Sequence, residues 1–270
     1  MKKDNLRAIV SNIVCKNPIL YAVIRNRHSG LYSKFIINVT NDKNSYASKK
    51  NSEVRLGIGN LAKLCDICIH FCQLYQLELN IDNNILSFQS DDEVYIDCYD
   101  LNEKDLDNIE FLKENSIDTV GTLVIYALTY TLFHEFGHVK YDDDSMLQIE
   151  KERTADNFAL EVLRELCNEE PNGRLEENPS FLGAYLDNIV TLLVSKAKDA
   201  EISMSHPHPI ERIYLFLEYF LIKDDSFLWK YAYDIIIKWA NDNHIAMTFE
   251  KDCSMSIKDK LLDAYHRFKK

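Results

Sequence analysis

The amino-acid sequence predicts an α+β fold, with a small β-sheet in residues 1–115 and a mainly helical part in residues 116–270. Only 7 glycines and 5 prolines occur in 270 residues, so long helices are rarely interrupted. Short runs of strand-forming residues lie in the first hundred positions, whereas apolar residues at helical spacing dominate after Ser116. A chain of this length can bury one large core, and we expect a single domain over residues 1–270.

The N-terminal part is expected to contain both helices and strands. Apolar residues at helical spacing predict helices over residues 1–20 and 58–77. The sequence FIINVT predicts a strand over residues 35–40, and the polar residues 41–51 predict a loop. Two further runs, ILSFQ at 85–89 and EVYID at 93–97, predict a β-hairpin. Residues 102–114 are highly charged and predict either a helix or a mobile segment.

The C-terminal part is expected to consist of successive helices. Ser116 or Asp118 can cap a helix that ends near Lys140, and this helix is apolar on most sides, which indicates a central, buried position. Ser145 can cap the next helix, which ends near Cys167. A loop follows at 169–180, and the remaining predicted helices cover residues 181–200, 208–222, 226–243 and 256–268.

Composition excludes several classes of function. The net charge of −12 argues against nucleic-acid binding, which depends on clustered Lys and Arg. No secretory signal is apparent, and the longest nearly uncharged run, residues 119–133, is too short for a membrane span. Seven cysteines form no disulfide framework. We therefore expect a protein of the reducing cytoplasm.

The predicted central helix carries the sequence His134-Glu135-Phe136-Gly137-His138. Two imidazoles four residues apart lie on one face of a helix and can reach a single tetrahedral Zn²⁺. Glu135 lies beside the open position of such a metal, where it can accept a proton from water. About one random chain in a hundred of this length contains the pattern by accident. However, a charged residue and two histidines in an apolar helix need partners.

The next predicted helix begins a second motif, Glu152-Arg153-Thr154-Ala155-Asp156. A short connection lets this helix fold back on the first, so that Glu152 can supply a third ligand through a carboxylate oxygen. Asp156 lies one turn later on the same face and can accept the free ring N–H of a ligating histidine. The alternative is an acidic surface helix, which the spacing after His138 disfavours.

A third motif, SHPHPIERI, begins at Ser205. His206 could stabilise the oxyanion that forms when water attacks a carbonyl, and Arg212 could orient the site or pair with a carboxylate. The alternative is a stiff turn and helix cap without a catalytic role. Sequence leaves open both this alternative and the choice between His206 and His208 as the histidine that faces the metal.

The order HEFGH, ERTADNFA, SHPHPIERI resembles the gluzincin zinc metallopeptidases over about residues 116–220. HtpX-type and CAAX-prenyl-protease enzymes are similar, and the spacing of His206 to Arg212 matches the His-Pro element of the HtpX type. Those enzymes span membranes, whereas the phage-exclusion (Lit-type) peptidases are soluble and resemble this chain more closely. ImmA/IrrE-type peptidases carry similar HExxH and Glu-Ala-Asp/Asn-Phe-Ala segments.

The resemblance implies a zincin-like fold and a zinc-dependent endopeptidase of the cytoplasm. It implies His134, His138 and Glu152 as Zn²⁺ ligands, Glu135 as general base and Asp156 as their support. The expected partner is a protein substrate. An activating partner or a phage-derived peptide is a second expected partner. Phage defence and repressor cleavage are the implied roles. In zincins an edge strand pairs with the substrate, and residues 93–97 are the candidate here.

Two other interpretations of the whole chain stay open. In one, the metal only braces the helices, although a structural site has no need of Glu135. In the other, the cleft stays closed until a partner binds, with residues 41–51 and 102–114 as lids. Cys65, Cys68 and Cys72 could suggest another zinc site, but buried thiols in a core helix explain them better. The run Asp142–Asp144 is best explained as a solvated loop.

Overall fold

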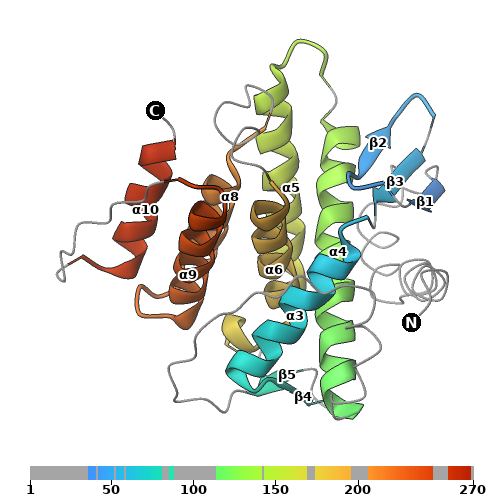
Figure 1. Cartoon of the computed structure of the whole chain (residues 1–270). Coiled ribbons are helices and arrows are strands. Elements are labelled where there is room, and N and C mark those ends of the chain that lie inside the picture. Colours follow the sequence, from blue (N-terminus) through green and yellow to red (C-terminus); the bar gives the residue numbers. More distant parts are fainter. Residues whose placement is uncertain are drawn as a thin grey trace. The chain divides into compact units, whose positions relative to one another are not determined.

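The computed structural model describes residues 36–40, 42–51, 53–57, 59–80, 85–87, 114–141, 143–168, 174–195, 206–245 and 255–268. Seven α-helices and two small β-sheets lie within these ranges. The predicted α+β class is confirmed, with the strands before residue 90 and mainly helices after it (Figure 1). The predicted helix at 1–20, the strand at 93–97 and the segment 102–113 lie outside the described residues.

The chain divides into two compact units. The first comprises residues Met1–Asp143 and Thr154–Asp187, and the second comprises Asp144–Arg153 and Asn188–Lys270. The boundaries fall inside α5 (Gln148–Asn168) and α6 (Pro179–Val194), so each of these continuous helices carries residues of both units.

The first unit contains a three-stranded sheet in the order β1-β3-β2. β1 (Ile36–Thr40) is parallel to β3 (Glu53–Gly57), and β2 (Tyr46–Ser48) is antiparallel to β3, with Tyr46 opposite Arg55. The predicted strand at 35–40 is confirmed. The prediction of a loop over 41–51 is wrong for β2. The polar sequence of this segment does not favour a strand, but pairing with β3 stabilises one there.

A second sheet contains a pairing that the sequence did not predict. β5 (Ile85–Ser87) pairs antiparallel with β4 (Glu78–Asn80), which directly follows α3 (Leu61–Tyr75). The predicted hairpin partner of this strand, the segment 93–97, lies outside the described residues.

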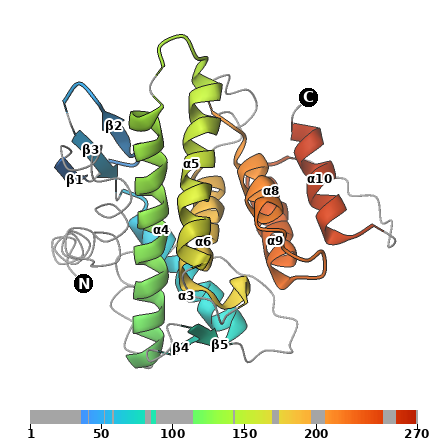
Figure 2. The ribbon, with the colours of Figure 1, turned by 180° about the vertical axis from the view of Figure 1, so that it is seen from behind.

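The long helix α4 (Glu114–Lys140) is the core of the first unit. It contacts α3, β2, β3 and β4, and most of its described side chains are buried, including Leu123, Leu132 and Phe136. α4 runs beside α5 in both views of the ribbon (Figures 1 and 2). The predicted central, buried helix at 116–140 is therefore confirmed.

Small residues allow α6 to approach α4 closely. A Cβ atom on Gly183 would lie 2.6 Å from Cβ of Tyr126 and 2.7 Å from the carbonyl oxygen of Leu123. A short 3₁₀ helix, η2 (Leu175–Glu177), precedes α6, so the described part of the predicted loop at 169–180 contains helical turns. Asn178 caps the start of α6, because its Oδ1 accepts the backbone N–H groups of Ser180 and Phe181.

The helix α5 begins at Gln148, three residues after the predicted cap Ser145. The N–H of Leu147 donates to the carboxylate of Glu150 over 3.0 Å. The negative charge of Glu150 in the first turn also interacts favourably with the positive end of the helix dipole.

The second unit packs α8 (Pro209–Tyr219), α9 (Phe227–Asp242) and α10 (Ile257–Phe268) around buried aromatic rings. The buried aromatic residues of α8 and α9 are Phe216, Trp229, Tyr231 and Trp239. The predicted helices at 208–222, 226–243 and 256–268 are confirmed. No helix within the described ranges is both long and apolar enough to cross a membrane.

Candidate metal centre

Two histidines lie on one face of α4. His134 and His138 are one helical turn apart, and their Nε2 atoms are 3.1 Å from each other. Side chains four residues apart in a helix point the same way, so the helix itself places the two imidazoles together. This pairing was expected from the HEFGH sequence.

Asp156 on α5 orients one of these rings. Its Oδ1 lies 2.8 Å from Nδ1 of His134, so the carboxylate can accept the ring N–H. This contact leaves Nε2 of His134, the nitrogen that faces His138, as the ring's lone-pair donor. A carboxylate behind a ligating histidine is the usual support in zinc sites.

A glycine allows α4 and α5 to come close enough for this contact. A Cβ atom on Gly137 would lie only 2.6 Å from Cα of Ala155 and 3.1 Å from its Cβ. No side chain larger than hydrogen therefore fits at position 137 without separating the helices. The small residue Ala155 on the opposite helix serves the same purpose.

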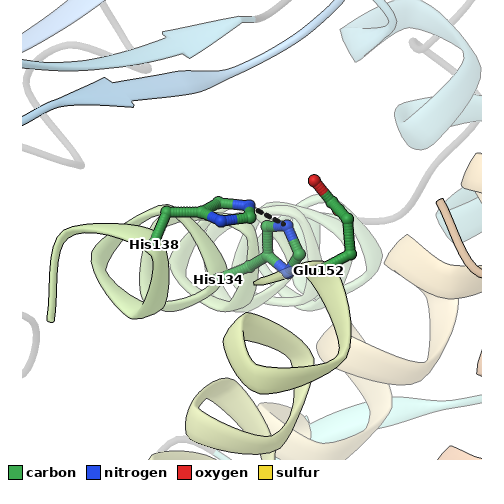
Figure 3. A group of neighbouring side chains, drawn as sticks. All are labelled: His134, His138 and Glu152. Atoms are coloured by element: carbon green, nitrogen blue, oxygen red, sulfur yellow. Dashed lines mark hydrogen bonds between the residues drawn. The ribbon is translucent and has the colours of Figure 1, made fainter. Parts of the chain in front are cut away.

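Glu152 adds a carboxylate to the two imidazoles. It is one turn before Asp156 on the continuous helix α5, so the Asp156–His134 contact also brings this turn of α5 toward the pair. His134, His138 and Glu152 can each offer one ligand atom, and these atoms lie within 4.8 Å of one another. Figure 3 shows the three side chains extending from the helices toward a common space. This group could bind a metal ion.

The donor set fits zinc. Two imidazole nitrogens and one carboxylate oxygen form one of the usual three-residue sets of catalytic zinc sites, which keep a fourth position open. Two nitrogens at bond lengths of about 2.0–2.1 Å in a tetrahedron lie about 3.3 Å apart. The observed separation of 3.1 Å is close to this value. The set is poorly suited to Mg²⁺ or Ca²⁺, which prefer oxygen ligands.

Glu135 follows His134 on α4, and only 7% of its surface is exposed. A carboxylate in such a position is costly to desolvate and needs partners. The sequence predicts this residue as the general base.

The carboxylate of Glu152 also accepts hydrogen bonds from side chains of its own unit. Nη2 of Arg212 donates to Oε2 over 3.0 Å, and Nε2 of Gln148 donates to Oε1 over 3.3 Å. Only 6% of the Glu152 side chain is exposed. The structure thus places the Arg212 guanidinium, which the sequence suggested as a carboxylate partner, on Glu152.

The two histidines of the third motif differ in position. Nε2 of His206 lies 3.4 Å from Oε1 of Glu152, and 56% of its side chain is exposed. His208 instead caps α8, since its Nδ1 accepts the N–H of Ile210. Its ring packs edge-on against Trp239, with 6.2 Å between ring centroids. His206 is therefore the histidine of this motif that lies beside Glu152.

Other candidate groups do not gather around a second metal. Within the described ranges, His134, His138 and Glu152 are the only group with metal-binding geometry. Cys68 is fully buried on α3, and burial raises the pKa values of Cys65 and Cys72 to about 12, which suits inert core thiols. The interpretation as buried core residues is supported for Cys68 and Cys72, whereas Cys65 is half-buried.

Sequence reasoning missed the roles of four residues near the group. Gly137 spaces the helices, Gln148 contacts Glu152, and Arg153 pairs with Glu211. A glycine inside an apolar helix costs about 1 kcal/mol, so Gly137 had a detectable signal. Arg153 and Glu211 had none, because they are far apart in the sequence.

Comparison with known proteins gives one match to a protein family. Residues 93–232, just over half of the chain, match the family described as Peptidase U49. The matched range includes α4, α5 and α8, and therefore every residue described above as part of the centre or in contact with it. No curated protein and no solved structure gives a match.

Proposed function

This chain belongs to the Peptidase U49 family, a peptidase family, and we propose that it is a zinc-dependent endopeptidase. The observation that supports the metal dependence is the group His134, His138 and Glu152. Family membership indicates peptide-bond hydrolysis, and the side-chain group indicates how such a reaction would be catalysed.

In this proposal His134, His138 and Glu152 hold Zn²⁺. Bound zinc supplies a Lewis acid that polarises the scissile carbonyl and makes water more acidic. Asp156 keeps His134 in the tautomer whose Nε2 can bind metal, because its carboxylate accepts the N–H on the other ring nitrogen. The protein thus contributes a donor set in which Asp156 fixes the orientation of the His134 ring.

Glu135 is the general base of the proposed reaction. Its carboxylate takes a proton from the attacking water and passes it to the amine that leaves. The Glu135 side chain is buried and directly follows the proposed ligand His134 on α4.

His206 and Arg212 are the proposed assisting residues. The exposed imidazole of His206 beside Glu152 can donate a hydrogen bond to the oxyanion that develops on the substrate carbonyl. Arg212 holds the Glu152 carboxylate through one oxygen, which orients the other oxygen for metal binding.

We further propose a cytoplasmic protein as the substrate and phage defence as the biological role. The support is the resemblance of the three motifs to the soluble phage-exclusion peptidases. In the same proposal an activating partner, such as a phage-derived peptide, starts cleavage. Mapping new protein N-termini in infected cells that express the wild type or Glu135→Gln would identify the substrate.

Substitution of Glu135 by Gln tests the proposed chemistry. The amide is isosteric but cannot accept a proton, so zinc content stays near one ion per chain while cleavage falls by at least about a hundredfold. Zinc is measured by elemental analysis, and cleavage is measured on the substrate found by N-terminus mapping. His138→Ala should lose both zinc and cleavage. Wild-type cleavage by Glu135→Gln would refute the assignment of the base.

A further inference from the structure

Two consecutive Glu-Arg pairs of the second unit face each other. Glu152 and Arg153 lie on α5, whereas Glu211 and Arg212 lie at the start of α8. Nη2 of Arg212 donates to Oε2 of Glu152 over 3.0 Å, and Nη2 of Arg153 donates to Oε1 of Glu211 over 2.9 Å. Each arginine thus binds the glutamate of the other helix.

Helix geometry explains why the charges pair across the two segments. Neighbouring residues in an α-helix point about 100° apart, so Glu152 and Arg153 are badly placed to bind each other. The same holds for Glu211 and Arg212. Each carboxylate therefore binds the arginine of the opposite helix. Because the two contacts lie at adjacent positions, they fix both the distance between the start of α8 and α5 and the rotation of α8 about its axis.

The two ion pairs differ in burial. Exposed fractions are 6% for the Glu152 side chain and 18% for Arg212, so this inner pair is largely shielded from water. In the outer pair, 12% of Glu211 and 49% of Arg153 are exposed. The inner pair contains the proposed metal ligand, and the outer pair has no atom in the ligand group.

We propose that Arg153 and Glu211 are a positioning pair for the metal centre. Their ion pair fixes the rotation of α8 relative to the first turns of α5, and this rotation directs the Arg212 guanidinium onto Oε2 of Glu152. The inference rests on the proposed function, because it concerns Glu152 as a metal ligand. It assigns a role to two residues that touch neither metal nor substrate.

The expected effect is modest because the outer pair is partly solvated. Without it the start of α8 can shift slightly relative to α5 while its core packing remains, so Arg212 orients Glu152 for metal binding during only part of the time. We expect zinc affinity to fall about two- to fivefold, the range that such a surface pair provides. The effect should be non-additive, since either substitution removes the same interaction.

A double-mutant cycle on the full-length chain tests this. Arg153→Gln, Glu211→Gln and the double variant are compared with wild type by zinc titration against a chromophoric chelator. The visible absorption of bound Co²⁺ reports ligand geometry, and metal-free melting reports general stability. Arg164→Gln is the matched control, because this exposed arginine lies on α5 about three turns beyond Arg153.

The inference predicts equal losses of zinc affinity in the two single variants and the double variant, a shifted Co²⁺ spectrum, and no change in the control. Wild-type affinity in both single variants would overturn it, as would independent, additive losses. A lowered melting temperature with an unchanged Co²⁺ spectrum would also overturn it, because it would show a purely structural role. If the wild type bound no zinc, the proposed function would fall together with the inference.

Discussion

At the scale of single residues, Asp156 orients the proposed ligand His134. Oδ1 of Asp156 lies 2.8 Å from Nδ1 of His134, and both side chains are largely buried. Without the carboxylate, the ring can rotate and can carry its proton on either nitrogen. We therefore expect Asp156→Ala to weaken zinc binding about 10- to 100-fold.

Chelator competition measures this loss directly. Asp144→Ala is the matched control, because the Asp144 side chain is fully exposed and forms only a long ion pair with Nζ of Lys151, at 3.9 Å. Equal zinc affinity in Asp156→Ala and wild type would show that the His134 ring is held by other contacts.

The glycine between Phe136 and His138 gives another residue-scale prediction. Ala is favoured over Gly inside a helix by about 1 kcal/mol, which would stabilise the protein. At Gly137, however, the new methyl group would meet Cα of Ala155 at 2.6 Å, and overpacking of this kind costs about 1–3 kcal/mol. We expect the clash to dominate, so that Gly137→Ala lowers both stability and zinc affinity.

Gly121 provides the control for this experiment on the same helix. A Cβ atom there would meet no atom of the described residues within 4 Å. Gly121→Ala should therefore raise the stability, measured by urea denaturation, by about 0.5–1 kcal/mol. If the two substitutions change the free energy of unfolding in opposite directions, the effect of packing is separated from that of helix propensity. A stabilised Gly137→Ala variant would contradict the close approach of α4 and α5.

At the scale of elements, the start of α8 depends on an unprotonated histidine. The pKa of His208 is lowered from 6.5 to about 4, chiefly because burial disfavours its charged form, while Glu211 opposes the shift. Neutral Nδ1 accepts the N–H of Ile210, and protonation would remove this cap. The first turn of α8 should therefore be sensitive to acid.

The sign of the pH dependence follows from proton binding. Between pH 6.5 and 4 the unfolded chain binds a proton at this position and the folded chain does not, so folding stability falls as the pH falls. The loss from this group is at most about 3 kcal/mol and is complete below pH 4. Denaturant titrations at several pH values should show a smaller decline for His208→Asn, which keeps a cap oxygen but does not titrate. Parallel pH curves for the two proteins would refute this.

The elements also show what sequence can and cannot predict. The helices at 116–140 and 145–167 were predictable because their apolar spacing is local and their interiors lack proline. The strands β2 and β3 were not predicted, because such short segments, of three and five residues, become strands mainly through pairing with each other. The start of α5 lies at Gln148, three residues after Ser145, because helix ends depend on local hydrogen bonds such as that from the N–H of Leu147 to Glu150.

The same distinction applies to the candidate metal centre. His134, Glu135 and His138 lie on one helix, and α5 follows after a short connection, so sequence spacing alone predicted that Glu152 and Asp156 return to them. The residues of the pair Arg153–Glu211 are 58 positions apart and belong to two different motifs, and no sequence spacing relates them. Contacts between distant helices depend on how the whole chain packs, and periodicity carries no information about that packing.

At the scale of the whole molecule, a bound metal should stabilise the folded chain. Ligands on different helices converge only in the folded state, so zinc binds that state preferentially and raises the free energy of unfolding. At a free zinc concentration of 100 times Kd the gain is about 2.7 kcal/mol. For a chain of this size we expect the melting temperature to rise by about 5–10 °C.

Variants separate binding from catalysis in the same measurement. Glu135→Gln should show the full zinc-dependent rise, because its ligand atoms are unchanged, and a strong chelator should reverse the rise in both wild type and this variant. His138→Ala should melt at the same temperature with and without zinc, because the two remaining ligands bind the metal far more weakly. If His138→Ala were stabilised as much as wild type, the ion would bind elsewhere, and the three-residue donor set would not be the metal centre.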